Sequence, residues 1–448
     1  MKQSNDFIEK TLHVAPMLNY STREFRQLMR ILSKRIVLWT EMVVDDTIHN
    51  AKNLDEHLAY PPDQHPIVCQ IGGNSPMLCG EATKVVERYG YDAIDFNIDC
   101  PSERVSGERE FGAVLLTKVE TAKSVLAAMK KNAVNVPISI KTRVGVDDLD
   151  DIEFITGFIQ EMLPFCTRFV IHARKCVLCG LMNARQNRSV PPLNYPRVYE
   201  LCRRFPQCDF WINGGIHSLK DAKLISYGIH AVSDIQHSCR MASDSSMQTF
   251  HEHHSVPCHI CRSNNGSCIA PPLIAPLNLK GCMLGRAAIE NPCIFWNADR
   301  YFYGEDKNPC RNRREVLDKY CEFLEKTYPR RCCDDDTRKT NQYPAPKVSF
   351  LYDSCHICQD IYGGQNVNHR QKQKDVNGSE SKMSTRIIGR ALKPVMGIFS
   401  GCPKSRIFRR TCDSLGKNTS TRDCGPGFIL RKAIQSMPDF ILDEDFVD

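Results

Sequence analysis

Eight short runs rich in apolar and β-branched residues recur along the chain, and each is followed by a segment of helical periodicity or by a turn. The runs occupy residues 12–17, 36–42, 66–72, 93–99, 136–144, 168–173, 210–213 and 281–284. Such repeats predict parallel strands joined by right-handed crossovers, and eight of them favour closure into a TIM (β/α)8 barrel. An open, doubly wound sheet is the alternative, but the first turn lacks the Gly-x-Gly-x-x-Gly pattern typical of that fold. After the first run, Ser21 and Glu24 have the spacing of a capping box, which predicts a helix that opens there.

The chain has 448 residues, more than one compact core ordinarily holds, so we expect two domains. We place an α/β barrel at residues 10–303 and a C-terminal all-helical domain at 313–440. No run of about 18 apolar residues occurs, and the first ten residues contain no apolar signal core. We therefore expect a protein that makes no contact with a membrane and lies in the cytoplasm, with an organelle as the alternative. We also expect a monomer.

Positive charge is concentrated toward the C-terminal end of the sequence. Residues 382–432 contain twelve Lys and Arg against only Asp413 and Asp423, in a chain whose formal net charge is +7. Such a basic face attracts the phosphate backbone of a nucleic acid, and a solvated surface without a partner is the alternative. The 23 cysteines are scattered along a chain without a secretory signal, so we expect reduced thiols rather than disulfides.

Polar or conformationally special residues stand at the C-terminal end of every predicted strand. In a barrel these ends converge on one face, where the active sites of this fold lie. A single such residue can be a structural polar group, whereas eight strands that all end this way indicate a site. The residues are Met17, Glu41, Gln70, Asn97 with Cys100, Lys141 with Arg143, His172 with Arg174, Asn213 with Gly214 and Gly215, and Gly285 with Arg286.

The residue types at these positions suggest a flavin site. Gly214-Gly215 and Gly285-Arg286 follow the last two strands, where this fold usually binds a phosphate through backbone N–H groups. Lys141 would be a buried cation, and a reduced flavin ring is an electron-rich partner for it. Gln70 and Asn97 could hydrogen-bond to the ring edge or to the substrate. His172 could hold a phosphate or a ring oxygen, and a structural histidine is the alternative.

Cys100 precedes Pro101-Ser102 at the end of the fourth run and therefore belongs to the same face. A cysteine thiol has an ordinary pKa of about 8.5 and is mostly protonated at neutral pH. It could thus act as a general acid that gives a proton to carbon while a hydride arrives on the adjacent atom.

Several stretches together resemble the tRNA-dihydrouridine synthases, in particular the branch that acts on positions 20 and 20a of the D-loop. They are Val14-Ala-Pro-Met17, Leu38-Trp-Thr-Glu-Met42, Asn97-Ile-Asp-Cys-Pro-Ser-Glu-Arg104, Ile140-Lys-Thr-Arg-Val-Gly145, Ile171-His-Ala-Arg-Lys175, Pro191-Pro-Leu-Asn-Tyr-Pro-Arg-Val198, Ile212-Asn-Gly-Gly215 and Met283-Leu-Gly-Arg-Ala287. The resemblance covers residues 10–228, 281–303 and 383–435.

The resemblance implies an FMN enzyme with NADPH as its reductant and tRNA as its substrate. Hydride would pass from the flavin to C6 of uracil while Cys100 protonates C5, giving 5,6-dihydrouridine. The implied FMN-binding residues are Ala15, Pro16, Met17, Gln70, Lys141, His172, Asn213, Gly214, Gly215, Gly285 and Arg286. The implied tRNA-binding residues are Asn97, Arg185, Arg188, Arg406 and Arg409. Two alternatives stay open, namely another FMN barrel that reduces a free pyrimidine or an enone, and a non-catalytic RNA-binding relic.

Two stretches, 232–280 and 348–382, interrupt the pattern, and each contains the tetrapeptide Cys-His-Ile-Cys, at 258–261 and 355–358. Cys-x-x-Cys pairs can be half-sites for zinc, but we predict no metal. Both stretches begin with Val-Ser, which the typical start of an intron can encode. Both end in Lys, which the codon AAG encodes, and introns end in AG. Our hypothesis is that they are translated retained introns. Sequencing the mature transcript tests it, and a main transcript that carries both stretches would contradict it.

Overall fold

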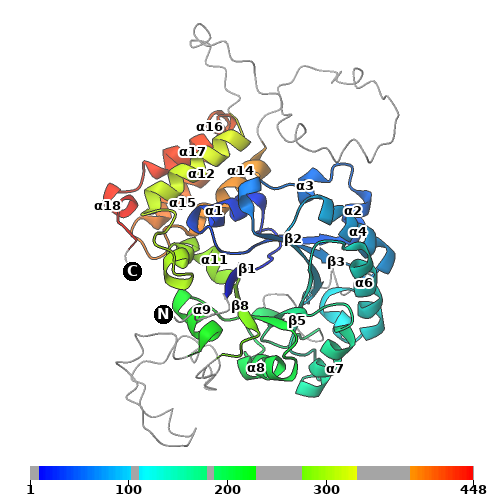
Figure 1. Cartoon of the computed structure of the whole chain (residues 1–448). Coiled ribbons are helices and arrows are strands. Elements are labelled where there is room, and N and C mark those ends of the chain that lie inside the picture. Colours follow the sequence, from blue (N-terminus) through cyan, green and yellow to red (C-terminus); the bar gives the residue numbers. More distant parts are fainter. Residues whose placement is uncertain (1–9, 102–109, 179–185, 229–274, 330–383, 447–448) are drawn as a thin grey trace, which may run out of the picture.

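A computed structural model describes residues 10–101, 110–178, 186–228, 275–329 and 384–446. Eight parallel strands form one sheet in the order β1-β8-β7-β6-β5-β4-β3-β2. Its two edges meet through backbone hydrogen bonds, Val37 N to Leu12 O at 2.8 Å and Val14 N to Val37 O at 2.9 Å. The strands therefore close into a ring surrounded by helices (Figure 1). The predicted TIM barrel is confirmed, and the open doubly wound sheet is excluded.

Each strand comes from one of the predicted apolar runs. The strands are β1 Thr11–Val14, β2 Leu38–Val44, β3 Ile67–Gly72, β4 Ala93–Ile98, β5 Ile138–Arg143, β6 Arg168–His172, β7 Asp209–Asn213 and β8 Leu279–Leu284. The main helices between them are α1 Arg23–Leu32, α4 Pro76–Arg88, α6 Val119–Asn132, α7 Ile152–Met162, α8 Tyr195–Arg204, α9 Leu219–Tyr227 and α11 Arg286–Glu290. Shorter segments are α2 Asp45–Asn50, α3 Asp55–Leu58, η1 Pro62–Gln64, η2 Gly112–Leu116, η3 Gln186–Arg188, η7 Pro292–Phe295 and η8 Ala298–Phe302.

The start of α1 differs from the predicted capping box. Thr22, not Ser21, is the N-cap and accepts the N–H of Phe25. The Ser21 hydroxyl instead stabilises the loop after β1, because it donates to Ala15 O at 2.8 Å and accepts from Met17 N at 3.0 Å. Glu24 is consequently available to make contacts outside its own helix.

Apolar side chains fill two separate regions, as the alternation along each strand requires. One set points outward from the sheet and packs under the helices, for example Ile94 and Ile140. The other set is small and lies inside the ring, and it consists of Ala15, Trp39, Val68, Val170 and Met283. Toward the C-terminal ends of the strands the interior positions become polar, and that end carries the candidate site.

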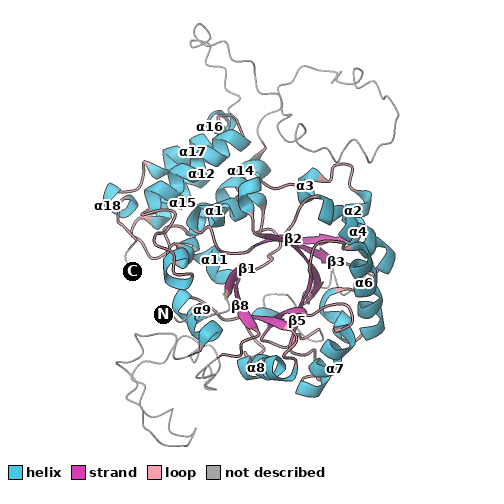
Figure 2. Cartoon of the chain, viewed as in Figure 1, coloured by secondary structure: helices cyan, strands magenta, loops and turns pink. Residues whose placement is uncertain are grey.

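The C-terminal part is all-helical in the residues described (Figure 2). It contains α12 Arg313–Thr327, α14 Thr385–Leu392, η9 Lys393–Gly397, α15 Ser405–Lys417, α16 Thr419–Asp423, α17 Gly425–Ile434 and α18 Asp439–Leu442. The fully buried carboxylate of Glu24, on α1, joins this part to the barrel. It accepts the Tyr328 hydroxyl at 2.6 Å and Arg390 Nε at 2.9 Å. Burial alone would raise the pKa of Glu24, but Arg390 and Tyr328 lower it below its ordinary value.

The eighth strand begins earlier than the sequence predicted. Leu279 and Lys280 belong to β8, so this strand begins two residues before the predicted start at 281. The backbone N–H of Ala275 donates to the carbonyl oxygen of Tyr227, the last residue of α9, at 3.3 Å. The rest of the interrupting stretch 232–280, the stretch 348–382 and both Cys-His-Ile-Cys tetrapeptides lie outside the described residues. Within the described residues, no helix is long and apolar enough to cross a membrane, and no group of His, Cys, Asp or Glu could hold a metal ion.

Candidate active site at the C-terminal ends of the strands

The structure brings most of the predicted site residues to one end of the barrel. Gln70, Asn97, Lys141, His172 and Asn213 project from β3, β4, β5, β6 and β7, and each is at most 8 % exposed. The segments Ala15–Met17, Gly214–Gly215 and Gly285–Arg286 follow β1, β7 and β8 and complete the rim. Burying so many polar groups is costly unless they are paired, so their partners define the site.

A chain of hydrogen bonds fixes the position of Cys100. Asn97 Oδ1 accepts the backbone N–H of Cys100 at 3.2 Å and that of Asp99 at 3.3 Å. Asn97 Nδ2 donates to Gln70 Oε1 at 3.0 Å, and Gln70 Nε2 donates to Asp95 Oδ2 at 2.8 Å. When Asp95 is ionised its carboxylate only accepts hydrogen bonds, so in that state it sets the orientation of both amides. The turn that presents Cys100 is thereby held from inside the barrel.

Asp95, at the buried end of this chain, is also hydrogen-bonded by the Ser139 hydroxyl at 2.7 Å. Burial raises the pKa of Asp95 to about 7, although Gln70 and Ser139 oppose that shift. Because a hydroxyl can accept as well as donate, Ser139 can serve either protonation state of the carboxyl group. Asp95 therefore titrates near neutral pH beneath the site.

Asp99 is the centre of a buried group of charges. Its carboxylate contacts Lys141 Nζ, lies 2.8 Å from Arg143 Nε and lies 3.3 Å from His172 Nδ1. Burial alone would raise the pKa of Asp99, but Lys141, Arg143 and His172 hold it well below its ordinary value. Burial and Arg143 lower the pKa of His172 to about 3, so its imidazole is neutral. We assign the His172 proton to Nδ1, facing the carboxylate, which leaves Nε2 as an acceptor.

Arg143 connects the segments that surround the site. Besides Asp99, its guanidinium donates to Lys175 O and to Asn187 O, both at 3.1 Å. Arg143 is 1 % exposed. It therefore fixes the end of β4 against the segments that follow β6, and it acts as a positioning residue.

Guanidinium groups gather where β6 and β8 end, a place suited to an anion. Arg174 is 4 % exposed, and within the described residues its Nε has no hydrogen-bond partner. Burial and the neighbouring Arg286 lower the pKa of Arg174 to about 10. Arg286 donates to Arg188 O at 3.0 Å. An unsatisfied buried donor costs about 1–3 kcal/mol, which a bound phosphate would offset.

The glycines after β7 permit close packing at the same place. Gly214 and Gly215 have φ of 114° and 69°, backbone conformations that other residues rarely adopt. A Cβ at Gly215 would lie 2.3 Å from Leu193 Cδ1, and one at Gly214 would lie 2.9 Å from His172 Cδ2. The backbone of this turn therefore approaches the site more closely than any residue with a side chain could.

The predicted tRNA-binding residues are only partly brought together. Asn97 lies inside the site, and Arg188 is exposed beside Arg286. Arg406 and Arg409 are exposed on α15, in the helical part. Arg185 lies outside the described residues.

Sequence reasoning did not assign roles to Asp95 and Asp99, and it noted Arg143 without giving it one. One signal was available, because Asp95 and Asn97 are two residues apart in a strand and so share the inward face. No local signal indicated that Asp99, beyond the strand end, would pair with Lys141.

Comparison with known proteins identifies relatives of this chain. The family described as "Dihydrouridine synthase (Dus)" matches residues 13–233. The tRNA-dihydrouridine(20/20a) synthase of Vibrio cholerae is 33% identical over 317 residues, which cover 70% of this chain and 80% of that protein. The protein of the same name from Escherichia coli K12 is 42% identical over 212 residues, 47% of this chain and 60% of that protein.

A solved structure titled "Crystal structure of TcOYE with pHBA" aligns with 65% of this chain and 89% of that one, at a TM-score of 0.39 and 8% identity. Our assignment does not depend on so distant a likeness. It depends on the matched family and on a relative that this chain covers over most of its length. The chain therefore belongs to the dihydrouridine synthase family.

Proposed function

We propose that this chain is an FMN-dependent tRNA-dihydrouridine synthase that reduces a D-loop uridine, at position 20 or 20a, with NADPH as the electron source. One observation carries the proposal: Cys100 is held by Asn97 at the mouth of the barrel, beside the buried ion pair of Lys141 with Asp99 and the neutral His172. The names of the bacterial relatives supply the substrate and the positions.

The residues present fit FMN in two respects. The unsatisfied Nε of Arg174 and the neighbouring Arg286 provide positive charge for a phosphate, next to the close backbone turn at Gly214–Gly215. Lys141 supplies a buried cation for the ring, and Gln70 and His172 supply polar groups. Ala15, Pro16, Met17, Asn213 and Gly285 would complete the binding site. When bound, FMN supplies the hydride for C6 of uracil and receives it in turn from NADPH.

Cys100 would provide the proton in this proposal. As hydride reaches C6, the C5=C6 double bond of uracil opens, and C5 takes a proton from the Cys100 thiol. The thiolate that remains is reprotonated from water before the next turnover. Asn97 and Gln70 keep Cys100 in place while this occurs, and Asp99 holds Lys141 and His172 through its carboxylate.

Arg188, Arg406, Arg409 and Arg185 would bind the tRNA backbone. Arg188 is exposed at the rim, and Arg406 and Arg409 are exposed on α15. Each phosphate contact that is removed should reduce the slope of log affinity against log salt by roughly one. Replacing Arg406 and Arg409 together by Ala should therefore lower that slope by about two.

The direct test is to incubate the protein with NADPH and unmodified tRNA and to map dihydrouridine by position. We expect product in the D-loop, a yellow protein with flavin absorbance and salt-sensitive tRNA binding. Cys100→Ala should keep the flavin and lose most product formation, while Cys402→Ala, which changes a partly exposed cysteine of the helical part, should keep both. Full activity of Cys100→Ala would contradict the proton-donor assignment. Reduction of free uracil without tRNA binding would favour a barrel of another specificity.

A further inference from the structure

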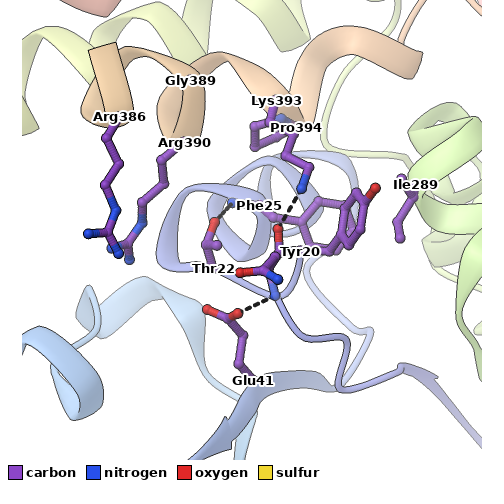
Figure 3. A pocket seen from close by; sticks show the side chains of 11 residues that line it. Tyr20, Thr22, Phe25, Glu41, Ile289, Arg386, Gly389, Arg390, Lys393 and Pro394 are labelled. Carbon is purple, nitrogen blue, oxygen red and sulfur yellow. Dashed lines mark hydrogen bonds between the residues drawn. The ribbon is translucent and has the colours of Figure 1, made fainter. Parts of the chain in front are cut away.

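A cavity of about 290 Å³ lies between the barrel and the helical part (Figure 3). Phe25 of α1 and Ile289 of α11 contribute to its walls, and most of its polar lining comes from three further places. Asn19 and Tyr20 belong to the loop after β1, Glu41 belongs to β2, and Arg386, Gly389, Arg390 and Lys393 belong to α14 and η9. The loop that supplies Asn19 and Tyr20 begins with Ala15–Met17 at the rim of the site, so one short loop connects the site and the cavity.

A strand irregularity directs Glu41 toward this cavity. The register between β2 and β3 shifts between Trp39 and Met42, and bulges of this kind re-aim side chains next to active sites. The Thr40 hydroxyl fills the resulting gap, because it accepts the N–H of Gln70 at 3.1 Å. Glu41 Oε1 then accepts the N–H of Asn19 at 2.5 Å. Its carboxylate keeps the capacity to accept further hydrogen bonds from a ligand.

Cations line the opposite wall. Arg386, Arg390 and Lys393 are spaced four and three residues apart, so they share the exposed face of α14 and η9. In Figure 3 the first two extend from α14 toward the side where Glu41 lies. Arg390 is fixed by Glu24 at 2.9 Å, and Lys393 Nζ lies 2.9 Å from Asn19 O and 3.6 Å from the centroid of the Tyr20 ring. Three cations against the carboxylates of Glu41 and Glu24 leave one positive charge in excess.

We infer that this cavity binds one unstacked guanine nucleotide of the same RNA, close in sequence to the uridine that is reduced. The inference rests on the proposed function, because it takes the RNA substrate as given. The volume lies near the lower end of the roughly 300–1,000 Å³ typical of ligand pockets, which suits a single nucleotide. The excess positive charge suits its phosphate, and proteins read single-stranded RNA by capturing such splayed bases.

The arrangement of charges favours guanine over the other bases. The Watson–Crick edge of guanine offers the N1–H and N2–H donors that a carboxylate such as Glu41 accepts, while its O6 and N7 accept from Lys or Arg. Uracil would offer the same carboxylate a single donor, N3–H, flanked by two carbonyl oxygens that face it unfavourably. Glu41 therefore acts as the selective group, and Arg386 and Lys393 supply affinity.

Gly389 allows the cavity to be filled without disturbing the fold. A Cβ at this helical position would meet no atom within 4 Å, so a larger side chain has open space to enter. Gly157, on α7, is a matched control, because it is also an exposed helical glycine whose Cβ would meet nothing within 4 Å. We therefore compare Gly389→Leu with Gly157→Leu, both in the full chain.

The readout is the Kd for unmodified tRNA without NADPH, measured beside flavin content and the rate of flavin reduction by NADPH without RNA. We expect Gly389→Leu to weaken RNA binding about tenfold, the loss of one charge-assisted contact, with the other two quantities unchanged. Gly157→Leu should match the wild type. Equal RNA binding by both variants would overturn the inference. A slower reaction with NADPH in Gly389→Leu alone would also overturn it, by assigning the cavity to the pyridine nucleotide.

Glu41→Gln tests the choice of base. Gln keeps an oxygen for the N–H of Asn19 but cannot accept two donors from guanine. Single guanosines of the D-loop are replaced by inosine, which lacks the N2 amino group, and the penalty on binding is compared between wild type and variant. We expect a penalty at one position in the wild type and none in Glu41→Gln; an equal penalty in both would contradict the inference. These assays measure binding and do not need turnover. If the wild type binds RNA in this way but forms no dihydrouridine, the proposed function is refuted and the inference about the cavity is not.

Discussion

Asn97 and Cys100 are joined by a hydrogen bond of 3.2 Å from the Cys100 backbone N–H to Asn97 Oδ1. This bond fixes the cysteine through its backbone, and the proposed chemistry uses its thiol. Asn97→Ala should therefore misplace Cys100 and lower kcat for dihydrouridine formation by at least about tenfold. If Asn97 acts instead by contacting tRNA, the loss will appear in KM with kcat preserved. If Asn97 positions Cys100, adding Cys100→Ala to the Asn97→Ala variant should lower kcat little further, because the two residues act as a unit.

Asp95 should make the stability of the barrel depend on pH near neutrality. Its pKa is raised from 3.8 to about 7, so the folded protein binds more protons than the unfolded chain between these values. The contribution to the free energy of unfolding is thus full below about pH 4 and falls as pH rises toward 7, by on the order of 1.4 kcal/mol per pH unit. Asp95→Asn, which can still accept from Gln70, should remove this slope. Denaturant unfolding at pH 5, 6 and 7 measures it, and identical slopes in both proteins would contradict the assignment.

The ion pair of Glu24 should make the free energy of unfolding depend on pH in the opposite direction. Its pKa is lowered from 4.5, so its stabilising contribution is present above about pH 4.5 and is lost as pH falls through the folded value. Glu24→Gln should lower the free energy of unfolding by about 1–3 kcal/mol at pH 7, because an amide cannot accept from both Tyr328 and Arg390. Arg390 is 44% exposed, so solvent screens its charge and the buried hydrogen bonds account for most of the effect. The difference between the two proteins should vanish at low pH; a constant difference would exclude this origin.

Asp99 should limit how strongly the flavin-free protein attracts anions to the site. Asp99→Asn removes the carboxylate that Lys141 and Arg143 share and leaves two buried cations without it, which destabilises the protein without flavin by about 3–5 kcal/mol. An added anion then becomes the counter-ion, so FMN should raise the melting temperature more in this variant than in the wild type. Thermal unfolding with and without FMN measures both effects. Asp150→Asn, at an ion pair with Arg197 farther along the chain, is the control and should leave the FMN effect unchanged.

The barrel and most of its site residues could be predicted because each depends on a local pattern. A strand shows its alternation within six residues, and its C-terminal end fixes where Gln70, Asn97, Lys141 and His172 must lie. The pairing of Asp99 with Lys141 could not be predicted, since it depends on how the turn after β4 approaches β5. The cavity lined by Glu41 and Arg390 could not be predicted either. It is formed by a strand irregularity and a helix that are more than three hundred residues apart in sequence.

The hydrogen bond from Ala275 N to Tyr227 O places the two ends of one interrupting stretch beside each other. The chain thus departs after α9 and returns before β8 at nearly the same point. A barrel anchored in this way tolerates different lengths of chain at that point, since loop closure costs little more as a loop grows. This junction is therefore a suitable place to graft an affinity tag or a fluorescent reporter, or to shorten the protein for crystallisation, without moving any strand that carries the site.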